Sequence, residues 1–356
     1  MKKFLALLLA LVMALSLAAC GGNNNDTQQG GDGDTATYPE YFAGMDQLIA
    51  DAQAEGELVV YGSCEEEYLA AACQHFEELF GIKTTYQRLS TGEVQAKVEE
   101  ENGNPSGDVW FGGTTDPYNV CAAEGLLEAY EATNASHLTS DMYRDADGYW
   151  YGIYKGILGF MVNTDELTRL GLEAPADWTD LLKDEYKGLI EMPNPTASST
   201  GYLYLKSLVN AWGEDEAFAY FDKLDANILK YTDSGSGPIK DLEAGECAIG
   251  LSLTFNAVEA INEGAPLDII FFEEGAPYSP TGCAIISGRE TDPAVQAVFS
   301  YLYSGVQDEY LATYLPEQVK IDQKTDIENF PSDIPYADMS NDTPDVKTAL
   351  LDKWAY

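Results

Sequence analysis

Four short segments rich in glycine, serine and threonine have the composition of an anion-binding site. They are Tyr61-Gly62-Ser63, Gly112-Gly113-Thr114-Thr115-Asp116, Thr196-Ala197-Ser198-Ser199-Thr200-Gly201 and Thr232-Asp233-Ser234-Gly235-Ser236-Gly237. Hydroxyl groups donate hydrogen bonds, and the N–H groups at a helix start add donors and partial positive charge. Each segment alone is explained as well by a turn or helix cap. Together they predict a polar cradle whose candidate ligand-binding residues are Ser63, Thr114, Thr115, Ser198, Ser199, Thr200, Gly201, Ser234, Gly235 and Ser236.

Three further residues are candidates for contacts with an organic solute. Thr254 and Asn256 follow an apolar run and can form hydrogen bonds with a polar ligand. Tyr151, in the sequence Tyr149-Trp150-Tyr151, offers an aromatic ring that can stack against a carbon skeleton. Ordinary packing of side chains explains these aromatic residues equally well.

Catalytic chemistry finds little support in this sequence. The chain has 2 histidines, His75 and His137, and neither lies in a recognisable motif. There is no Gly-x-Ser-x-Gly, no His-Glu-x-x-His and no phosphate-binding loop ending in lysine. The run Glu65-Glu66-Glu67 suggests metal binding or acid–base work, but acidic residues in a first helical turn commonly complement the helix dipole. We therefore predict no enzymatic activity, no catalytic residue, no metal ligand and no cofactor.

The elements that would position these residues alternate regularly along the chain. Strand patterns at 58–61, 82–89, 108–111, 153–163, 189–192, 247–253, 267–272 and 283–287 alternate with helix patterns at 65–80, 92–101, 117–124, 177–185, 200–212, 214–224 and within 293–315. Such alternation predicts an α/β fold with parallel sheets covered by helices. In such sheets, ligands bind beyond the carboxyl ends of the strands, where the four polar segments are expected. The chain is long enough for two α/β lobes. Their sheets are expected to face each other across a cleft.

The start of the chain is typical of an export signal. Lys2 and Lys3 precede an apolar run that ends at Leu17-Ala18-Ala19, directly before Cys20. This arrangement resembles a bacterial lipoprotein signal, with residues 1–19 removed and Cys20 lipidated. Residues 20–37 are rich in Gly, Asn, Gln, Asp and Thr, so they are predicted to form a flexible tether. We expect an extracytoplasmic protein attached to the outer face of the bacterial cell membrane through this lipid only.

The charge excludes one class of partner. The chain carries 60 Asp and Glu against 19 Lys and Arg, a formal net charge of −41. Nucleic acid is therefore not an expected partner, because phosphate backbones are bound by basic surfaces. The acidity is interpreted as a solvating exterior that favours a monomer.

The cysteines do not predict a disulfide framework. Of 6 cysteines, Cys20 is assigned to lipid, and the others show no Cys-x-x-Cys spacing. If Cys64 and Cys73 lie on one helix, they stand roughly 13 Å apart, too far for a disulfide. We predict no essential disulfide among the remaining residues Cys64, Cys73, Cys121, Cys247 and Cys283.

Several segments resemble the solute-binding proteins of bacterial ABC importers. They include Pro175-Ala176-Asp177-Trp178-Thr179-Asp180-Leu181-Leu182, Tyr186-Lys187-Gly188-Leu189-Ile190, Asn163-Thr164-Asp165-Glu166-Leu167 and Leu242-Glu243-Ala244-Gly245-Glu246. The likeness runs from residue 57 to about 315 and is greatest to the branch of ferric-ion, phosphonate and sugar-phosphate binders. It implies the two-lobed periplasmic-binding-protein-like type II fold with a hinge. The resemblance places lobe 1 at 38–157 plus 281–331 and lobe 2 at 158–280 plus 332–356.

The resemblance also bears on the ligand. Ferric-ion binders hold iron with two adjacent tyrosines, and the matching positions here are Leu253 and Thr254. Without phenolate oxygens, the hard donors that iron prefers are missing. The resemblance thus implies capture of a small polar solute, an organic phosphate or phosphonate-like anion, by hinge closure and its delivery to a permease. The alternatives are a ferric-ion or cationic-solute binder of the same family and, from another class, a secreted hydrolase using cleft carboxylates.

Overall fold

The computed structural model describes residues 42–132, 135–290, 292–302, 319 and 327–356. All of them lie in one unit, Tyr38–Tyr356. The predictions for residues 1–19, Cys20 and the tether at 20–37 lie outside the described residues. No helix within the described part is both long and apolar enough to cross a membrane.

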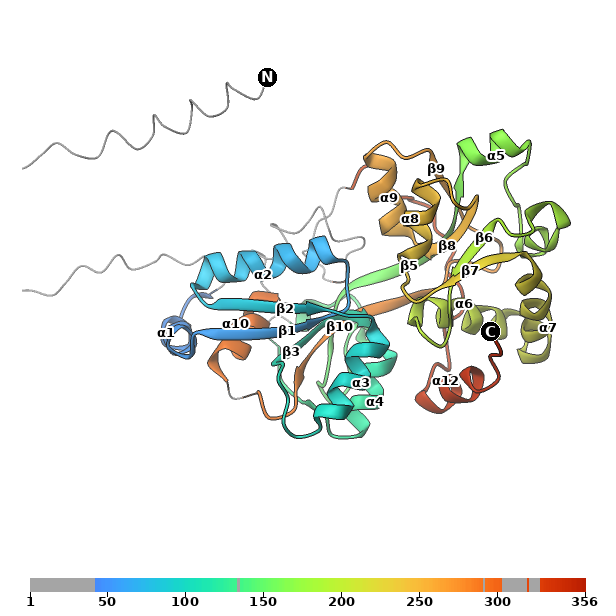
Figure 1. Cartoon of the computed structure of the whole chain (residues 1–356). Helices are drawn as coiled ribbons and strands as arrows, with labels where there is room; N and C mark the ends of the chain where they lie inside the picture. Colours follow the sequence, from blue (N-terminus) through green and yellow to red (C-terminus); the bar gives the residue numbers. More distant parts are fainter. Residues whose placement is uncertain (1–41, 133–134, 291, 303–318, 320–326) are drawn as a thin grey trace, which may run out of the picture. The chain divides into compact units, whose positions relative to one another are not determined.

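A first half-sheet is built from three parallel strands near the start of the described chain (Figure 1). These are β2 (Lys83–Arg88), β1 (Glu57–Gly62) and β3 (Val109–Thr114), in that spatial order. One face packs on α1 (Asp46–Glu55), α2 (Glu66–Phe80) and α10 (Pro293–Leu302), and the other on α3 (Thr91–Glu101) and α4 (Asp116–Ala123). Leu58 and Trp110, which lie on opposite faces, are both fully buried. Burial on both faces explains the apolar runs of β1 and β3, whereas β2, at the edge, is polar and largely exposed.

A second half-sheet repeats this arrangement with residues from the middle of the chain. Its parallel strands are β8 (Ile249–Leu253), β6 (Ile190–Pro193) and β7 (Ile228–Thr232), and β9 (Leu267–Ile270) lies beside them. Its helices are α5 (Thr164–Leu170), α6 (Ser199–Trp212), α7 (Glu214–Leu224), α8 (Gly237–Glu243), α9 (Thr254–Asn262) and α12 (Pro344–Leu351). Trp178 anchors the core with edge-on contacts to Phe160 and Tyr220.

Two long antiparallel strands connect the half-sheets. In β5 (Tyr151–Asn163), residues 151–157 pair with β10 (Tyr278–Ile286), and residues 158–163 pair with β8 and β9. The change of partner coincides with the predicted lobe boundary, although the division into two lobes stays a prediction. The predicted parallel pairing is present among β1, β2 and β3 and among β6, β7 and β8, whereas β5 and β10 run antiparallel to their neighbours. The α/β fold itself is confirmed.

Other local predictions need correction. The helix expected over 177–185 is replaced by two 3₁₀ turns, η5 (Trp178–Leu182) and η6 (Asp184–Tyr186). Lys183 between them has extended backbone angles, which end the first turn. The strand expected at 283–287 begins earlier, at Tyr278. The five cysteines that the structure describes are all buried, and the absence of an essential disulfide stays a prediction.

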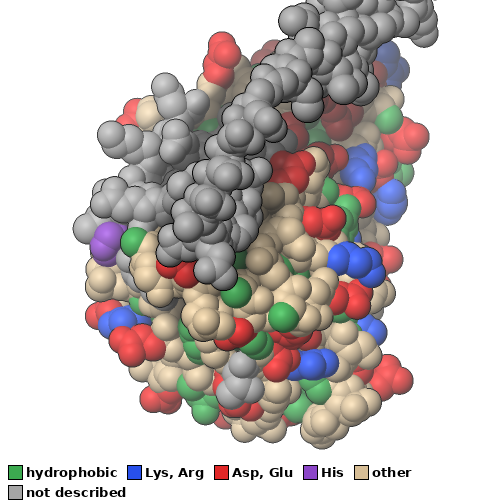
Figure 2. Space-filling view, turned by 90° about the vertical axis from the view of Figure 1, so that its left-hand side faces the viewer, with side chains coloured by type: hydrophobic (Ala, Val, Ile, Leu, Met, Phe, Trp, Pro, Cys, Tyr) green, Lys and Arg blue, Asp and Glu red, His purple; other side chains and the backbone are tan. Residues whose placement is uncertain are grey.

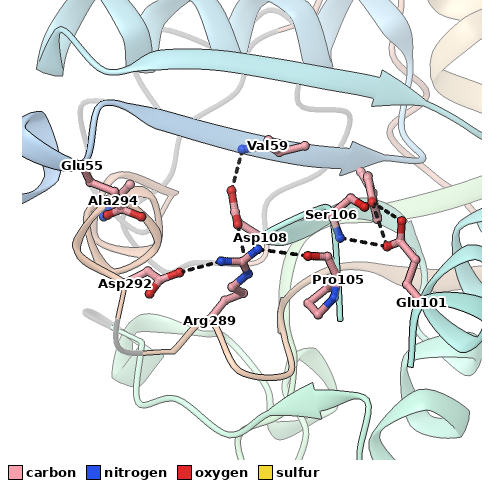
Figure 3. Close-up of polar contacts among 10 residues, drawn as sticks. Glu55, Val59, Glu101, Pro105, Ser106, Asp108, Arg289, Asp292 and Ala294 are labelled. Carbon is pink, nitrogen blue, oxygen red and sulfur yellow. Dashed lines mark hydrogen bonds and ion pairs between the residues drawn. The ribbon is translucent and has the colours of Figure 1, made fainter. Parts of the chain in front are cut away.

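A cluster of polar side chains lies at the end of the first half-sheet where β3 begins (Figure 3). Asp108, directly before β3, accepts a hydrogen bond from the Val59 N–H at 2.7 Å and pairs with Arg289 at 3.3 Å. Arg289 also donates to the Pro105 carbonyl and pairs with Asp292. Burial raises the pKa of Asp108, while the Val59 N–H and Arg289 act against that rise. These polar groups are paired with one another, so we interpret the cluster as structural.

Acidic side chains are spread over the visible surface with a few basic ones between them (Figure 2). Within the described residues, several Lys and Arg side chains form exposed ion pairs, such as Lys83–Glu57 and Arg144–Asp141. Pairs of this kind contribute little to stability, usually about 0–1 kcal/mol. The surface therefore agrees with a solvating role for the excess acidity.

One carboxyl group is buried without full pairing. Glu191 on β6 is 1% exposed, and its Oε2 atom has no hydrogen-bond partner among the described residues. Burial and nearby Asp241 together raise the pKa of Glu191 to about 7, and Lys230 opposes the shift. Lys230 instead donates to Asp241 at 2.5 Å. The protonated form of Glu191 is thus favoured in the folded protein.

Glu191→Gln is expected to stabilise the protein above neutral pH. A raised folded pKa contributes stability that is present below the unfolded pKa and is lost as pH rises through about 7. For wild type this loss amounts to roughly 3 kcal/mol at pH 8, so the neutral isostere should gain roughly 1–3 kcal/mol there. Urea unfolding of both proteins at pH 8 and pH 5 measures the difference, which should shrink by more than half at pH 5. An equal difference at both values would contradict the assignment.

Candidate functional site

A small polar cavity lies between residues of the two half-sheets. Its volume is about 60 Å³, and it is open to solvent on one side. The lining residues are Ser63, Glu65, Arg88, Ser90, Thr91, Gly113, Thr114, Tyr154, Gly156, Leu158, Ser198, Ser199, Thr200, Leu203, Asp233, Ser234, Gly235, Ser236, Leu253, Ser279 and Thr281.

The cavity lies where parallel strands end and helices begin. The connections after β1, β2 and β3 contribute from the first half-sheet, and those after β6, β7 and β8 contribute from the second. The crossing strands β5 and β10 supply its floor, including Tyr154 and Thr281. Carboxyl ends of parallel strands are the usual ligand position in such sheets.

The start of α6 provides the densest set of donors. Ser198, Ser199 and Thr200 are 7%, 8% and 8% exposed, yet their hydroxyl groups have no hydrogen-bond partner within the described chain. The first N–H groups of any helix also lack partners inside the helix. Buried hydroxyl groups normally find a partner, so donors left facing a cavity indicate a missing acceptor.

The start of α3 lies across the cavity from α6. Ser90 caps this helix by accepting from the Glu93 N–H, and Glu93 in turn accepts from the Ser90 N–H at 2.7 Å. The next residue, Thr91, also lines the cavity. A Cβ atom at Gly92 would lie 3.7 Å from the Ala197 carbonyl, so the two half-sheets approach closely at this rim.

Arg88 is the basic residue among those that line the cavity. It ends β2, is half-buried, and donates from Nε to the Cys64 carbonyl at 3.1 Å. This bond fixes one edge of the guanidinium group and leaves its other donors for an anion. The guanidinium group of Arg88 therefore places a positive charge beside the hydrogen-bond donors at the start of α3.

The loop between β7 and α8 is shaped by close packing. A Cβ atom at Gly235 would lie 2.2 Å from the Thr200 Oγ1 atom, so a larger residue there would displace the α6 donors. Ser252 donates to the Gly235 carbonyl at 2.6 Å and holds the loop in place. Ser234 and Ser236 share a hydrogen bond of 3.2 Å at the cavity wall.

Two predicted residues line the cavity with their donors already used. Ser63 donates to the Gly112 carbonyl at 2.6 Å and accepts from Trp110. Thr114 donates to Asp116. A Cβ atom at Gly113 would lie 2.4 Å from the Ser63 Oγ atom, and the glycine has a φ of +86°. These hydroxyl groups position the loop rather than present free donors.

Glu65 places a negative charge in the same cavity. It precedes α2 as the N-cap residue, but its side chain makes no capping hydrogen bond. Tyr154 donates to Glu65 Oε2 at 3.1 Å. Burial raises the pKa of Glu65, while hydrogen bonds from its own backbone and from Tyr154, and the nearby Arg88, oppose that rise.

The structure places five of the predicted residues away from the cavity. Tyr151 is buried in the core, where its hydroxyl donates to the Tyr130 carbonyl at 2.7 Å. Thr115 lines a separate cavity on α4, and Asn256 lines an acidic one beside α9. Thr254 is fully buried at the start of α9, and Gly201 packs so closely that a Cβ atom would lie 2.3 Å from the Pro193 carbonyl.

Sequence reasoning missed several lining residues. Three of them lie at the end of β2 or shortly after it: Arg88, Ser90 and Thr91. Their position where a strand ends could have identified them as candidates. Glu65 was interpreted as a complement to the helix dipole, which the structure does not support. Tyr154 lies within an apolar strand, and nothing in its spacing marks which face it occupies.

The arrangement gives no sign of a metal centre. The described residues hold no group of three or more His, Cys, Asp or Glu side chains that could bind a metal ion. Leu253, one of the positions that matches a ferric-ion ligand, presents an apolar side chain to the cavity. The site offers hydroxyl groups, helix N-termini, the guanidinium group of Arg88 and the carboxyl groups of Glu65 and Asp233, which together can bind a small polar solute.

Comparison with known proteins gives a consistent result. The family model described as "Bacterial extracellular solute-binding protein" matches residues 119–342. An uncharacterized Haemophilus influenzae protein is 36% identical over 69% of this chain and 73% of its own length. A Salmonella typhimurium protein, named for 2-aminoethylphosphonate binding in the periplasm, is 30% identical over 43% of this chain and 42% of its own.

A solved structure is similar over most of the chain. The periplasmic binding protein AfuA of Actinobacillus pleuropneumoniae, described with exogenous fructose-6-phosphate bound, has a TM-score of 0.77 and 31% identity. The match covers 84% of this chain and 98% of that protein. The resemblance proposed from sequence is therefore confirmed, and the chain belongs to the bacterial extracellular solute-binding proteins, the periplasmic binding proteins of the ABC import family.

Proposed function

We propose that this protein captures a compact organic phosphate or phosphonate and delivers it to an ABC permease without chemical change. The observation that carries the proposal is the set of nearly buried hydroxyl groups of Ser198, Ser199 and Thr200, which face the cavity without a partner among the described residues. They lie at the N-terminus of α6, where backbone donors and partial positive charge favour an anion.

Two other features of the cavity support an organic anion over a bare ion. Arg88 and the start of α3 add positive charge and donors from the other half-sheet. Leu158, Leu203 and Leu253 contribute apolar walls that can contact a carbon skeleton. AfuA and the Salmonella relative, with fructose-6-phosphate and 2-aminoethylphosphonate in their descriptions, support the same ligand class.

The mode of action follows from where the donors lie. Because α3 and α6 belong to different half-sheets, an anion between them is held from both sides only when the half-sheets are close. A ligand that binds one arrangement better shifts the population toward it. We infer that the solute stabilises a closed form by a hinge at β5 and β10, and that this form docks on the permease.

The ligand class can be tested by calorimetry on the purified protein. Fructose 6-phosphate or 2-aminoethylphosphonate is expected to bind with a Kd in the micromolar range or tighter, because several charge-assisted hydrogen bonds form in a partly enclosed site. Ferric citrate and spermidine serve as probes for the metal and cationic alternatives, and 4-nitrophenyl phosphate turnover tests the hydrolase. Binding of iron or spermidine alone, or sustained turnover, would reject the proposal.

The role of α6 can be tested with Thr200→Val and Ser199→Ala. Each variant removes one donor to the anion, and a hydrogen bond to a charged group is worth about 1.5–3 kcal/mol, so affinity should fall about tenfold to hundredfold. Ser207→Ala is the matched control, because Ser207 lies buried on the same helix and donates to the Tyr204 carbonyl outside the cavity. Equal losses in all three variants would indicate a general effect on α6 instead.

We also propose that Cys20 carries a lipid that anchors the protein outside the cell membrane. This rests on the sequence alone, in which the apolar run and Leu17-Ala18-Ala19 precede Cys20. Cys20→Ser should release the protein from the membrane fraction while solute binding stays unchanged, as fractionation followed by calorimetry would measure. A variant that stays membrane-bound to the wild-type extent would contradict lipid anchoring.

A further inference from the structure

Glu65 poses a problem for an anion-binding cavity. Its carboxylate lines the same cavity as Arg88 and the α6 hydroxyl groups, where it repels a phosphate. Its position at the start of α2 does not explain it, because the side chain makes no capping hydrogen bond. Its neighbours Glu66 and Glu67 are exposed and sit in the first turn of the same helix, where they complement the dipole.

The surroundings of Glu65 hold the carboxylate in place as an acceptor. Tyr154, which is 5% exposed on β5, donates to Oε2 at 3.1 Å. Burial raises the pKa of Glu65, and the hydrogen bond from Tyr154 and the nearby Arg88 oppose that rise and favour the charged form. An ionised carboxylate accepts several hydrogen bonds and donates none, so one from Tyr154 leaves acceptor capacity toward the cavity.

We propose that Glu65 determines specificity by accepting a hydrogen bond from a hydroxyl or ammonium group on the carbon skeleton of the solute, so that solutes with such a donor are preferred over bare oxyanions. This assignment of Glu65 narrows the class of solute in the proposed function and rests on that function. A phosphate bound at α6 and α3 tolerates the nearby carboxylate when the same molecule brings a donor to it. Sulfate, inorganic phosphate and alkylphosphonates bring no such donor on carbon and meet only the repulsion.

The acidic surroundings beyond Glu65 agree with this assignment. A second cavity shares Glu65, Arg88, Ser234 and Ser236 with the first and is further lined by Glu259. A donor group on the solute therefore points toward negative potential, while its phosphate lies among the donors of the helix starts.

A matched series of ligands tests the proposal. Ethylphosphonate, 2-hydroxyethylphosphonate and 2-aminoethylphosphonate share one skeleton and differ in the terminal donor, and fructose 6-phosphate is a larger hydroxyl-bearing probe. Wild type should bind at least one donor-bearing probe about tenfold or more tighter than ethylphosphonate and sulfate. Glu65→Gln should lose about tenfold or more for that probe and gain affinity for ethylphosphonate or sulfate. The probe with the larger loss identifies ammonium or hydroxyl as the donor.

Glu78→Gln is the matched control, because it removes the same charge from the same helix, α2, at an exposed position that lines neither cavity. It should leave the preference unchanged, and thermal unfolding checks that each variant folds. If Glu65→Gln alters the affinity of all probes equally, or alters none, the assignment of Glu65 is wrong while the proposed function stands. If wild type binds no organic phosphate or phosphonate, the proposed function is wrong and the assignment falls with it.

Discussion

The antiparallel pairing of β5 with β10 is the constraint on which the site depends. Residues 151–157 of β5 pair with β10 in the first half-sheet, and residues 158–163 pair with β8 and β9 in the second. One continuous strand thus fixes the direction of both half-sheets, so that the carboxyl ends of their parallel strands line one cavity. Without this crossing, the hydroxyl groups of α6 would not face Arg88 and the start of α3.

The proposed solute is an anion, although the chain carries a formal net charge of −41. The proposal and the charge are compatible because the interactions concerned act over different distances. Exposed charges are screened beyond about 8 Å at physiological ionic strength, whereas donors that touch the ligand act in a partly enclosed site where screening is weak. Buried hydroxyl groups at a helix start therefore outweigh a dispersed acidic surface, and that surface slows the approach of an anion more than it weakens the bound state.

The sequence predicted the fold and part of the site for reasons that the structure makes clear. Segments between a strand and a helix could be located from the alternation of patterns, so Ser198 to Thr200 and Ser234 to Ser236 were found. Side chains on strands were not, because apolar β5 is buried on both faces and alternation carries no information there. Tyr151 and Tyr154 both pack in the core of the first half-sheet, and Tyr154 also lines the cavity, a difference that the apolar pattern of the strand does not mark.

The glycines next to the site show how little space surrounds its hydroxyl groups. At Gly113 and Gly235, an added Cβ atom would meet the oxygens of Ser63 and Thr200 within 2.4 Å and 2.2 Å. Backbone and hydroxyl groups are therefore packed together, and the space left for a ligand is narrow. A compact group such as a phosphate can enter among them, while the leucine walls and Glu65 are left for the remainder of the molecule. In the proposed mode of binding, recognition is therefore divided: the helix starts bind the charge, and the crossing strand and α2 distinguish what the charge is attached to.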